Sequence, residues 1–172
     1  MGNPVTLRLG ALVVVFLSSC LWQACALADS SKVNIEEPQL HKLAGRTHDR
    51  ESIAISIKVS SSSQPIPYSN YLGTGAGRPK TLVTDLKVQI AGQQLFVPLS
   101  TYSDLSATRE ASLEVEAGRT LLVLTGGDAS EGYKVAIAIG NHLVSSREVY
   151  SLLAPSNPTQ KTEYSLVEIK DE

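Results

Sequence analysis

The sequence predicts an all-β fold, an antiparallel β-sandwich of about eight strands with at most short helical turns. Apolar and polar residues alternate with a period of two in several segments, which is the pattern of strands with one buried face. Turns rich in Gly, Asn and Ser join neighbouring segments, where a parallel sheet would need helical crossovers. Because strands with one apolar face need a second layer to cover it, we expect two packed sheets.

Residues 1–28 are expected to be a secretory signal rather than part of the fold. One basic residue, Arg8, precedes nine apolar or glycine residues, Leu9 to Leu17, and small residues follow. Nine residues are far fewer than the roughly 20 that span a bilayer as a helix. We therefore predict export, with no transmembrane span.

Two processing routes fit this signal. Ala26-Leu27-Ala28 is an A-x-A site, and cleavage after it would leave Asp29 as the first residue. Leu17-Ser18-Ser19-Cys20 resembles the lipobox of bacterial lipoproteins, in which Cys20 would carry a lipid anchor. Both routes indicate bacterial export, to the periplasm or the medium in the first case and to a membrane surface in the second.

Cleavage after Ala28 would leave a single domain of 144 residues, enough for its own core. It would remove both cysteines and the only tryptophan, so no disulfide would stabilise the fold. Losing Arg8 leaves 14 basic against 17 acidic side chains, interspersed along the chain. We expect no nucleic-acid partner, because that would need a basic stripe.

Residues 29–51 are polar and highly charged, and they predict an N-terminal arm or an edge strand. Within them, Pro38 and Gly45 could frame one or two helical turns. The sandwich domain is expected to occupy residues 52–172. Its two strongest strands are Ser52–Ser60, with Ile53, Ile55, Ile57 and Val59 facing inward, and Thr81–Ile90, with Leu82, Leu86, Val88 and Ile90 facing inward.

The rest of the chain continues the pattern. Thr101 and Asp104 have the T-x-x-D spacing of a capping box and predict a helical turn between strands. Ala117-Gly118 is expected to be a hairpin turn. The remaining strands are expected at Gln94–Pro98, Ser112–Gly118, Arg119–Gly127, Tyr133–Gly140, His142–Ser151 and Thr162–Ile169.

Two glycine-rich stretches suggest sites but favour plain connections. TGGDASEGY, Thr125–Tyr133, lies between two predicted strands, and its Gly, Asp and Ser are the residues that a hairpin bend needs. Asp128 and Glu131 lack the spacing of a calcium loop. Ser130 lacks the preceding Gly of a nucleophile elbow. GTGAGRPKT, residues 73–81, matches neither dinucleotide nor P-loop spacing and predicts a flexible connector.

No metal, cofactor or catalytic set is predicted. His41 and His48, with Asp49 and Glu51, could gather a metal, but they have no rigid ligand spacing and are expected at the surface. His142 lies in no motif. Carboxylates that converge from different strands are left open, because sequence spacing cannot reveal them.

Tyr68 and Tyr71 are the candidate ligand-binding residues, since both lie in a long Pro- and Gly-rich loop. The alternative is that they anchor this loop by packing against the domain. We expect a non-catalytic binding or structural accessory domain of the bacterial cell envelope, with an envelope protein or glycan as partner. An envelope hydrolase acting on glycan or peptide through convergent carboxylates is the alternative function. A third is an inhibitor-like domain, which would need an exposed apolar or aromatic patch.

Overall fold

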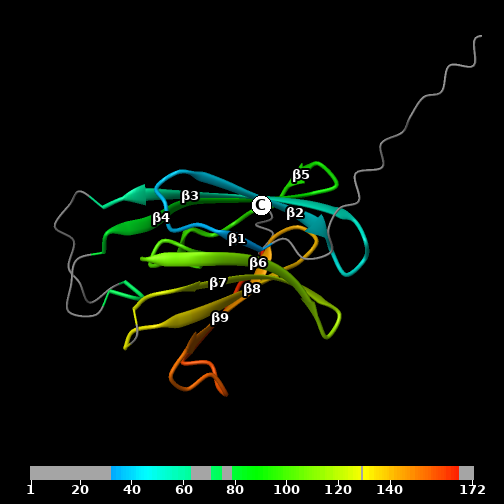
Figure 1. Cartoon of the computed structure of the whole chain (residues 1–172). Helices are drawn as coiled ribbons and strands as arrows, with labels where there is room; N and C mark the ends of the chain where they lie inside the picture. Colours follow the sequence, from blue (N-terminus) through cyan, green and yellow to red (C-terminus); the bar gives the residue numbers. More distant parts are fainter. Residues whose placement is uncertain (1–31, 63–70, 75–78, 129, 167–172) are drawn as a thin grey trace, which may run out of the picture.

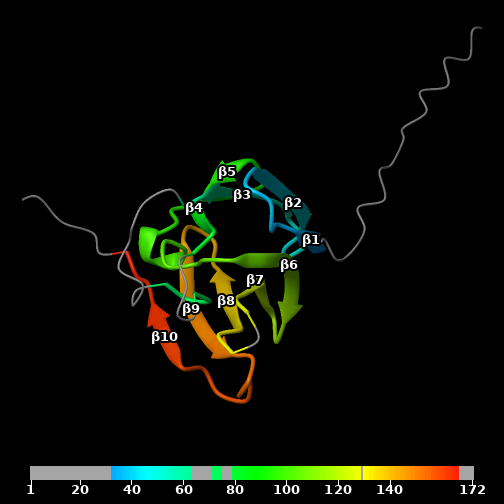
Figure 2. The same ribbon diagram turned by 60° about the vertical axis from the view of Figure 1, so that its left-hand side comes forward.

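The computed structural model describes residues 32–62, 71–74, 79–128 and 130–166 and has the predicted all-β architecture. Two antiparallel sheets, one of six strands and one of four, form two layers (Figures 1 and 2). One short 3-10 helix, Leu99–Thr101, lies between β5 and β6. The strands are β1 Lys32–Asn34, β2 Leu40–Arg46, β3 Ser52–Ser61, β4 Thr81–Ile90, β5 Gln93–Gln94, β6 Thr108–Glu116, β7 Arg119–Gly126, β8 Tyr133–Ile139, β9 Val144–Ser151 and β10 Gln160–Glu163.

The strand order follows the chain closely. The six-stranded sheet has the order β1-β6-β7-β8-β9-β10, so β6 to β10 form an up-and-down meander. The four-stranded sheet has the order β2-β3-β4-β5. Residues 35–39 and 95–107 carry the chain from one sheet to the other. The turn between β6 and β7 is at Ala117 and Gly118 as predicted, and both residues have the positive φ of a type I′ turn, at +49° and +73°.

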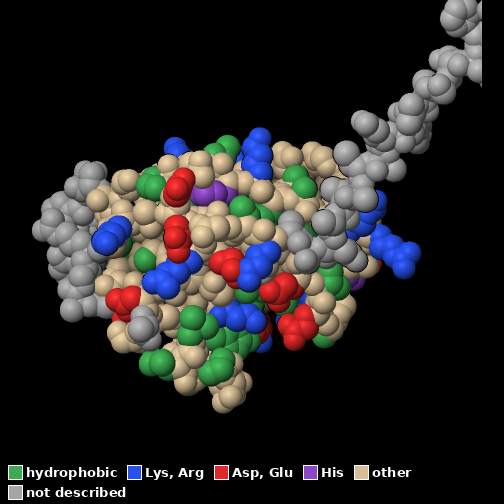
Figure 3. Space-filling view, viewed as in Figure 1, with side chains coloured by type: hydrophobic (Ala, Val, Ile, Leu, Met, Phe, Trp, Pro, Cys, Tyr) green, Lys and Arg blue, Asp and Glu red, His purple; other side chains and the backbone are tan. Residues whose placement is uncertain are grey.

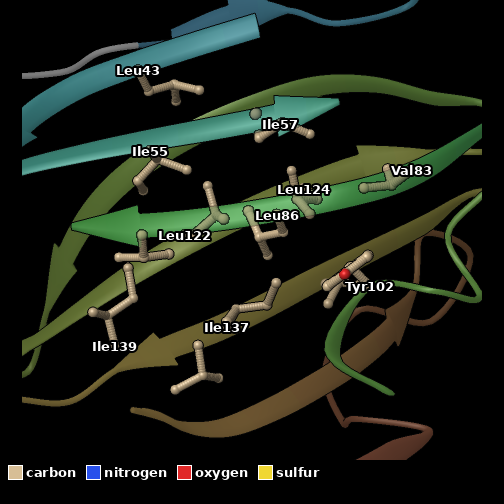
Figure 4. Packing of buried hydrophobic residues seen from close by; sticks show 14 of the residues in the cluster. Leu43, Ile55, Ile57, Val83, Leu86, Tyr102, Leu122, Leu124, Ile137 and Ile139 are labelled. Carbon is tan, nitrogen blue, oxygen red and sulfur yellow. The ribbon is translucent and has the colours of Figure 1, made fainter. Parts of the chain in front are cut away.

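The main core lies between the two sheets. The four predicted inward residues of β3 are each 3% exposed or less, while Lys58 is exposed. In Figure 4, Ile55 and Ile57 of β3 and Leu86 of β4 lie opposite Leu122, Leu124 and Ile137 of the other sheet. Burying each such side chain stabilises the fold by about 1.5–3 kcal/mol, so this alternation is the main determinant of the sandwich.

The prediction for β4 was wrong at one residue. Leu82 was expected to face inward, but it is half-buried, and Val83 is 2% exposed instead. The register changes between Lys58, which pairs with Asp85, and Val59, which pairs with Val83. Thr84 is therefore an extra residue in β4, and such a bulge reverses which side chains face the core beyond it.

The N-terminal segment belongs to the sandwich. The edge-strand alternative is correct, since β1 pairs with β6 and β2 pairs with β3. The helical turns expected between Pro38 and Gly45 were wrong. His41 and Leu43 are buried and alternate with exposed neighbours, as in a strand. Because the inward residue 41 is a polar histidine, the sequence does not show the period-two alternation of apolar residues.

The helical turn near Thr101 exists, but the capping box does not. The 3-10 helix ends at Thr101 instead of beginning there, and Thr101 Oγ1 is buried without a hydrogen-bond partner among the described residues. Asp104 instead binds Arg147, whose Nη2 lies 2.8 and 2.7 Å from its two carboxylate oxygens. The Arg147 side chain is 5% exposed, so this ion pair holds the segment after the helix against β9.

Two further strands are shorter than predicted. Of Gln94–Pro98, only Gln94 is in β5, and Phe96 is 60% exposed. The last strand, β10, ends at Glu163, and residues 167–169 of the predicted strand lie outside the described residues. On the face of the molecule in Figure 3, basic and acidic side chains are interspersed, as the sequence indicated.

Candidate functional site

The stretch TGGDASEGY is the bend of a hairpin. It connects β7 and β8, which are antiparallel neighbours with Gly126 paired to Tyr133, so this prediction is confirmed. Asp128 stabilises the bend itself, because its Oδ1 accepts hydrogen bonds from the Glu131 N–H at 3.3 Å and the Ser130 hydroxyl at 3.4 Å. Aspartate commonly closes a turn in this way.

The glycines of this bend permit a close approach between two loops. Gly73, in the long loop between β3 and β4, and Gly127 have φ values of +79° and +80°. A Cβ on Gly73 would lie only 2.8 Å from Gly127 Cα and 2.7 Å from Tyr133 Cε1. Real Cβ atoms do not come so close, so the two backbones meet where no side chain fits. Gly73 of one glycine-rich stretch and Gly127 of the other therefore form one structural unit, while residues 75–78 of GTGAGRPKT lie outside the described residues.

Tyr133 joins this unit to β6. Its hydroxyl donates to the Ser106 carbonyl at 2.9 Å and lies 2.8 Å from Thr108 Oγ1. Burial raises the pKa of Tyr133 strongly, because the phenolate would lose its hydration. The group is therefore a neutral structural donor.

The same network holds the segment that carries Tyr71. The Ser106 hydroxyl donates to the Leu72 carbonyl, and the Leu72 N–H donates to the Asp104 carbonyl at 2.8 Å. Asp104 is in turn bound to Arg147 on β9. Consecutive hydrogen bonds thus connect Tyr133, the Tyr71 segment and β9.

A pocket of about 160 Å³ opens above this network. Tyr71, one of the two predicted ligand-binding residues, lines it, whereas Tyr68 lies outside the described residues. Tyr150, at the end of β9, forms another part of the wall. The other lining residues are Leu72, Gly73, Ser130, Glu131, Gly132, Tyr133, Val149, Ser151 and Thr159.

Sequence reasoning missed Tyr150, which belongs to no unusual motif. The available signal was its position, because it lies at the end of a predicted strand where loops gather. Its hydroxyl donates a 2.6 Å hydrogen bond to Glu148 Oε2. That bond, together with burial, raises the pKa of Tyr150, since ionisation would remove the donated proton.

A second hollow, of about 110 Å³, lies on the face of the six-stranded sheet turned away from the main core. Leu121, Val123 and Ala138 form a separate buried cluster on this face, each 5% exposed or less. Small side chains give the hollow its depth, and charged ones surround it. Its lining residues are Glu116, Arg119, Leu121, Lys134, Ala136, Ala138, Ser146, Glu148 and Tyr150.

Glu116 and Glu148 are the two carboxylates that line this hollow. They are relevant to the alternative function, a hydrolase that acts through convergent carboxylates. Glu148 is already engaged, since one oxygen accepts the Tyr150 hydroxyl and the other lies 3.8 Å from Lys161 Nζ. Both Glu116 and Arg119 are close enough to Tyr150 to influence its pKa electrostatically. Tyr150 lines both cavities and connects them.

The histidines differ partly from expectation. His41 was expected at the surface but is buried, and its Nε2 lies 2.8 Å from the Glu37 carbonyl oxygen, to which it can donate. His142 is exposed. Within the described part of the chain, no group of three or more His, Cys, Asp or Glu side chains is placed to hold a metal ion.

His48 forms a hydroxyl–imidazole–carboxylate arrangement that the sequence did not suggest. Its Nε2 lies 3.0 Å from Asp49 Oδ2, and its Nδ1 lies 3.4 Å from Thr120 Oγ1. Thr120 is 1% exposed, and its hydroxyl oxygen also accepts the His48 backbone N–H at 2.9 Å. A substrate carbonyl could not reach this buried oxygen. The arrangement instead ties the turn between β2 and β3 to the other sheet.

Comparisons of the chain with protein-family models, with curated proteins and with solved structures find no match. Among the described residues, no helix has the length and apolar character needed to cross a membrane.

Proposed function

We propose that this protein is an exported, non-catalytic binding or structural accessory domain of the bacterial cell envelope. In this proposal it binds an envelope protein or a glycan in the pocket lined by Tyr71 and Tyr150. The observation that carries the proposal is that three tyrosines from different segments, Tyr71, Tyr133 and Tyr150, line one pocket of about 160 Å³.

The chemistry of the pocket suits recognition. Tyrosine rings offer a large contact area at a low cost in conformational entropy, and their hydroxyls supply hydrogen bonds. The Tyr71 segment is held by backbone bonds to Leu72 and by the close approach of Gly73 and Gly127. A pocket whose walls are already ordered loses less entropy when a ligand binds.

Photo-crosslinking tests this site. A photoreactive phenylalanine in place of Tyr71, in the full chain expressed in an exporting bacterium, should form an adduct with an envelope component. The matched control places the same group at Val115, which is 58% exposed at the other end of the six-stranded sheet. Equal adducts at both positions, or none at Tyr71, would count against the pocket.

Export is supported by the N-terminal signal pattern. We propose cleavage after Ala28, with lipidation of Cys20 as the alternative that would anchor the protein to a membrane surface. Mass spectrometry of the exported protein should show Asp29 as its first residue and no lipid. A diacylglyceryl mass on Cys20, abolished by Cys20→Ala, would establish the anchored form instead.

An envelope hydrolase is the second candidate function, favoured by one observation. Glu116 and Glu148 line the same hollow on the outer face of the six-stranded sheet. Paired carboxylates can supply the acid and base of glycoside hydrolysis. Release of reducing sugars from purified peptidoglycan, lost in both Glu116→Gln and Glu148→Gln while Glu114→Gln retains it, would favour the enzyme over the binding domain.

A further inference from the structure

The edges of the two sheets differ sharply in length. β1, β5 and β10 have three, two and four residues, whereas β2 has seven. Natural proteins keep edge strands short or interrupt them with proline or bulges, because an exposed edge pairs with other chains. β2 contains no proline, and its register with β3 has no bulge. It is the one long, regular edge among the described strands.

Hydrogen bonds at both ends of β2 establish which backbone groups face outward. The Val59 N–H donates to the Gln39 carbonyl, and the Thr47 N–H donates to the Glu51 carbonyl, both at 2.9 Å. In an antiparallel pair, bonded and non-bonded positions alternate, so the odd-numbered residues of β2 bond to β3. The even-numbered residues therefore direct their N–H and C=O groups away from the sheet; they are Leu40, Lys42, Ala44 and Arg46.

This edge offers a row of hydrogen-bonding groups with no partner. Each even-numbered residue contributes one N–H and one C=O, and no described residue forms a hydrogen bond with them. The same four residues are exposed, and Leu40 is 55% exposed. An added strand would satisfy these groups in the way that neighbouring strands satisfy one another.

Basic side chains beside this edge indicate that an acidic segment would bind there. Lys42 and Arg46 are exposed on the outer face of the four-stranded sheet, and Lys58 and Lys87 are on the same face. Of these four cations, Lys87 forms an ion pair, with its Nζ 3.4 Å from Asp85 Oδ2. Opposite charges placed directly across two strands attract, and like charges repel.

From these observations we propose that β2 binds an extended acidic segment of another polypeptide by β-augmentation. Two carboxylates four residues apart in that segment would lie opposite Lys42 and Arg46, with apolar residues in the alternate positions. The cations also disfavour pairing with β2 of a second copy, because that would place further positive charge on the same face. The proposal does not depend on the Tyr71 pocket.

Amide hydrogen exchange of the full chain, followed by NMR, tests the edge directly. The probe is a synthetic seven-residue peptide that alternates Val with polar residues and carries Glu at its second and sixth positions. Without peptide, the amides of Lys42 and Ala44 should exchange quickly, while those of His41 and Leu43 are already protected. With peptide, Lys42 and Ala44 should become protected by at least tenfold.

Two variants make the test specific. Ala44→Pro removes an outward N–H without removing a bond to β3, so it should abolish peptide binding while His41 and Leu43 stay protected. Ala44→Ser is the matched control and should bind normally. The pair Lys42→Glu and Arg46→Glu should weaken binding about tenfold or more, and a peptide with Lys in place of Glu should then bind better than the acidic one.

Three outcomes would overturn the proposal: equal binding of acidic and basic peptides by the native chain, unchanged binding by Ala44→Pro, and protection of Lys42 that rises with protein concentration when no peptide is present. The last would assign the edge to a second copy of this chain instead.

Discussion

The Tyr133 hydroxyl lies 2.8 Å from Thr108 Oγ1, although β7 separates their strands β8 and β6. Both residues pair with Gly126 on β7, Thr108 from one side and Tyr133 from the other. A Cβ on Gly126 would lie 2.6 Å from the Tyr133 hydroxyl and 2.8 Å from Thr108 Cα. Because Gly126 has no side chain, the Tyr133 side chain can reach across β7 to Thr108 on β6.

Tyr133→Phe should destabilise the fold by about 1–3 kcal/mol, because it leaves the Ser106 carbonyl and the Thr108 hydroxyl buried without their partner. Denaturant unfolding followed by circular dichroism measures the change. Tyr164→Phe is the control: among the described residues its hydroxyl takes part only in an exposed 3.4 Å contact with Ser100, so its effect should stay within about 0.5 kcal/mol. Similar effects for both variants would contradict the role of Tyr133.

The protein should lose stability at alkaline pH. Burial raises the pKa of Tyr133 above its ordinary value of 10.0, so the folded state keeps this proton where the unfolded state releases it. The unfolded state then binds fewer protons, and the free energy of unfolding falls as the pH rises above about 10, by up to 1.4 kcal/mol per pH unit. Tyr133→Phe should show a shallower decline between pH 10 and 11.5. Parallel declines in both proteins would be evidence against this assignment.

Gly127→Ala should cost more than Gly118→Ala, although the two glycines have nearly the same φ, +80° and +73°. A Cβ on Gly118 meets no atom within 4 Å, so its cost is the backbone strain alone, about 1–2 kcal/mol. A Cβ on Gly127 would also collide with the Glu131 carbonyl, which should add about 1–3 kcal/mol. Thermal unfolding of both variants measures the difference, and equal shifts in Tm would show that the bend can relax.

Ile57→Ala should destabilise the protein by about 2–5 kcal/mol, because Ile57 is completely buried between the sheets. Its neighbour Lys58 faces solvent, so Lys58→Ala should change stability by less than about 0.5 kcal/mol. Both are read from urea unfolding curves. Small and equal effects at the two positions would refute the inward orientation of β3.

Asp128→Ala should cost about 1 kcal/mol or less, since the hydrogen bonds of its carboxylate to described residues are all within the exposed bend that contains it. Calcium should leave the Tm unchanged. A cation at a hundred times its dissociation constant would add about 2.7 kcal/mol, which is several degrees for a domain of this size. A calcium-dependent rise in Tm that disappears in Asp128→Ala would make the bend a metal site.

The fold class, and the strands whose two faces differ in polarity, could be predicted from the amino-acid sequence alone. In β3 the alternation of Ile53, Ile55, Ile57 and Val59 with small or polar residues is regular, and burial follows it at every position. The hairpin turns at Ala117-Gly118 and within TGGDASEGY were also readable, since positive φ and short-range backbone hydrogen bonds restrict the residues that can occupy them. These features depend on residues that are close together in the chain, so a single sequence is enough to predict them.

Features that depend on partners distant in the chain became visible in the three-dimensional structure alone. The bulge at Thr84 exchanged Leu82 for Val83 in the core, and pairing with β3 made a strand of the segment around His41. The Tyr71–Tyr150 pocket depends on the contact between the loops that carry Gly73 and Gly127, which are distant in the chain. β2 has a free edge because it has a neighbouring strand, β3, on one side only. Cross-strand pairing and contacts between loops set these features, and the spacing of residues along one chain does not reveal them.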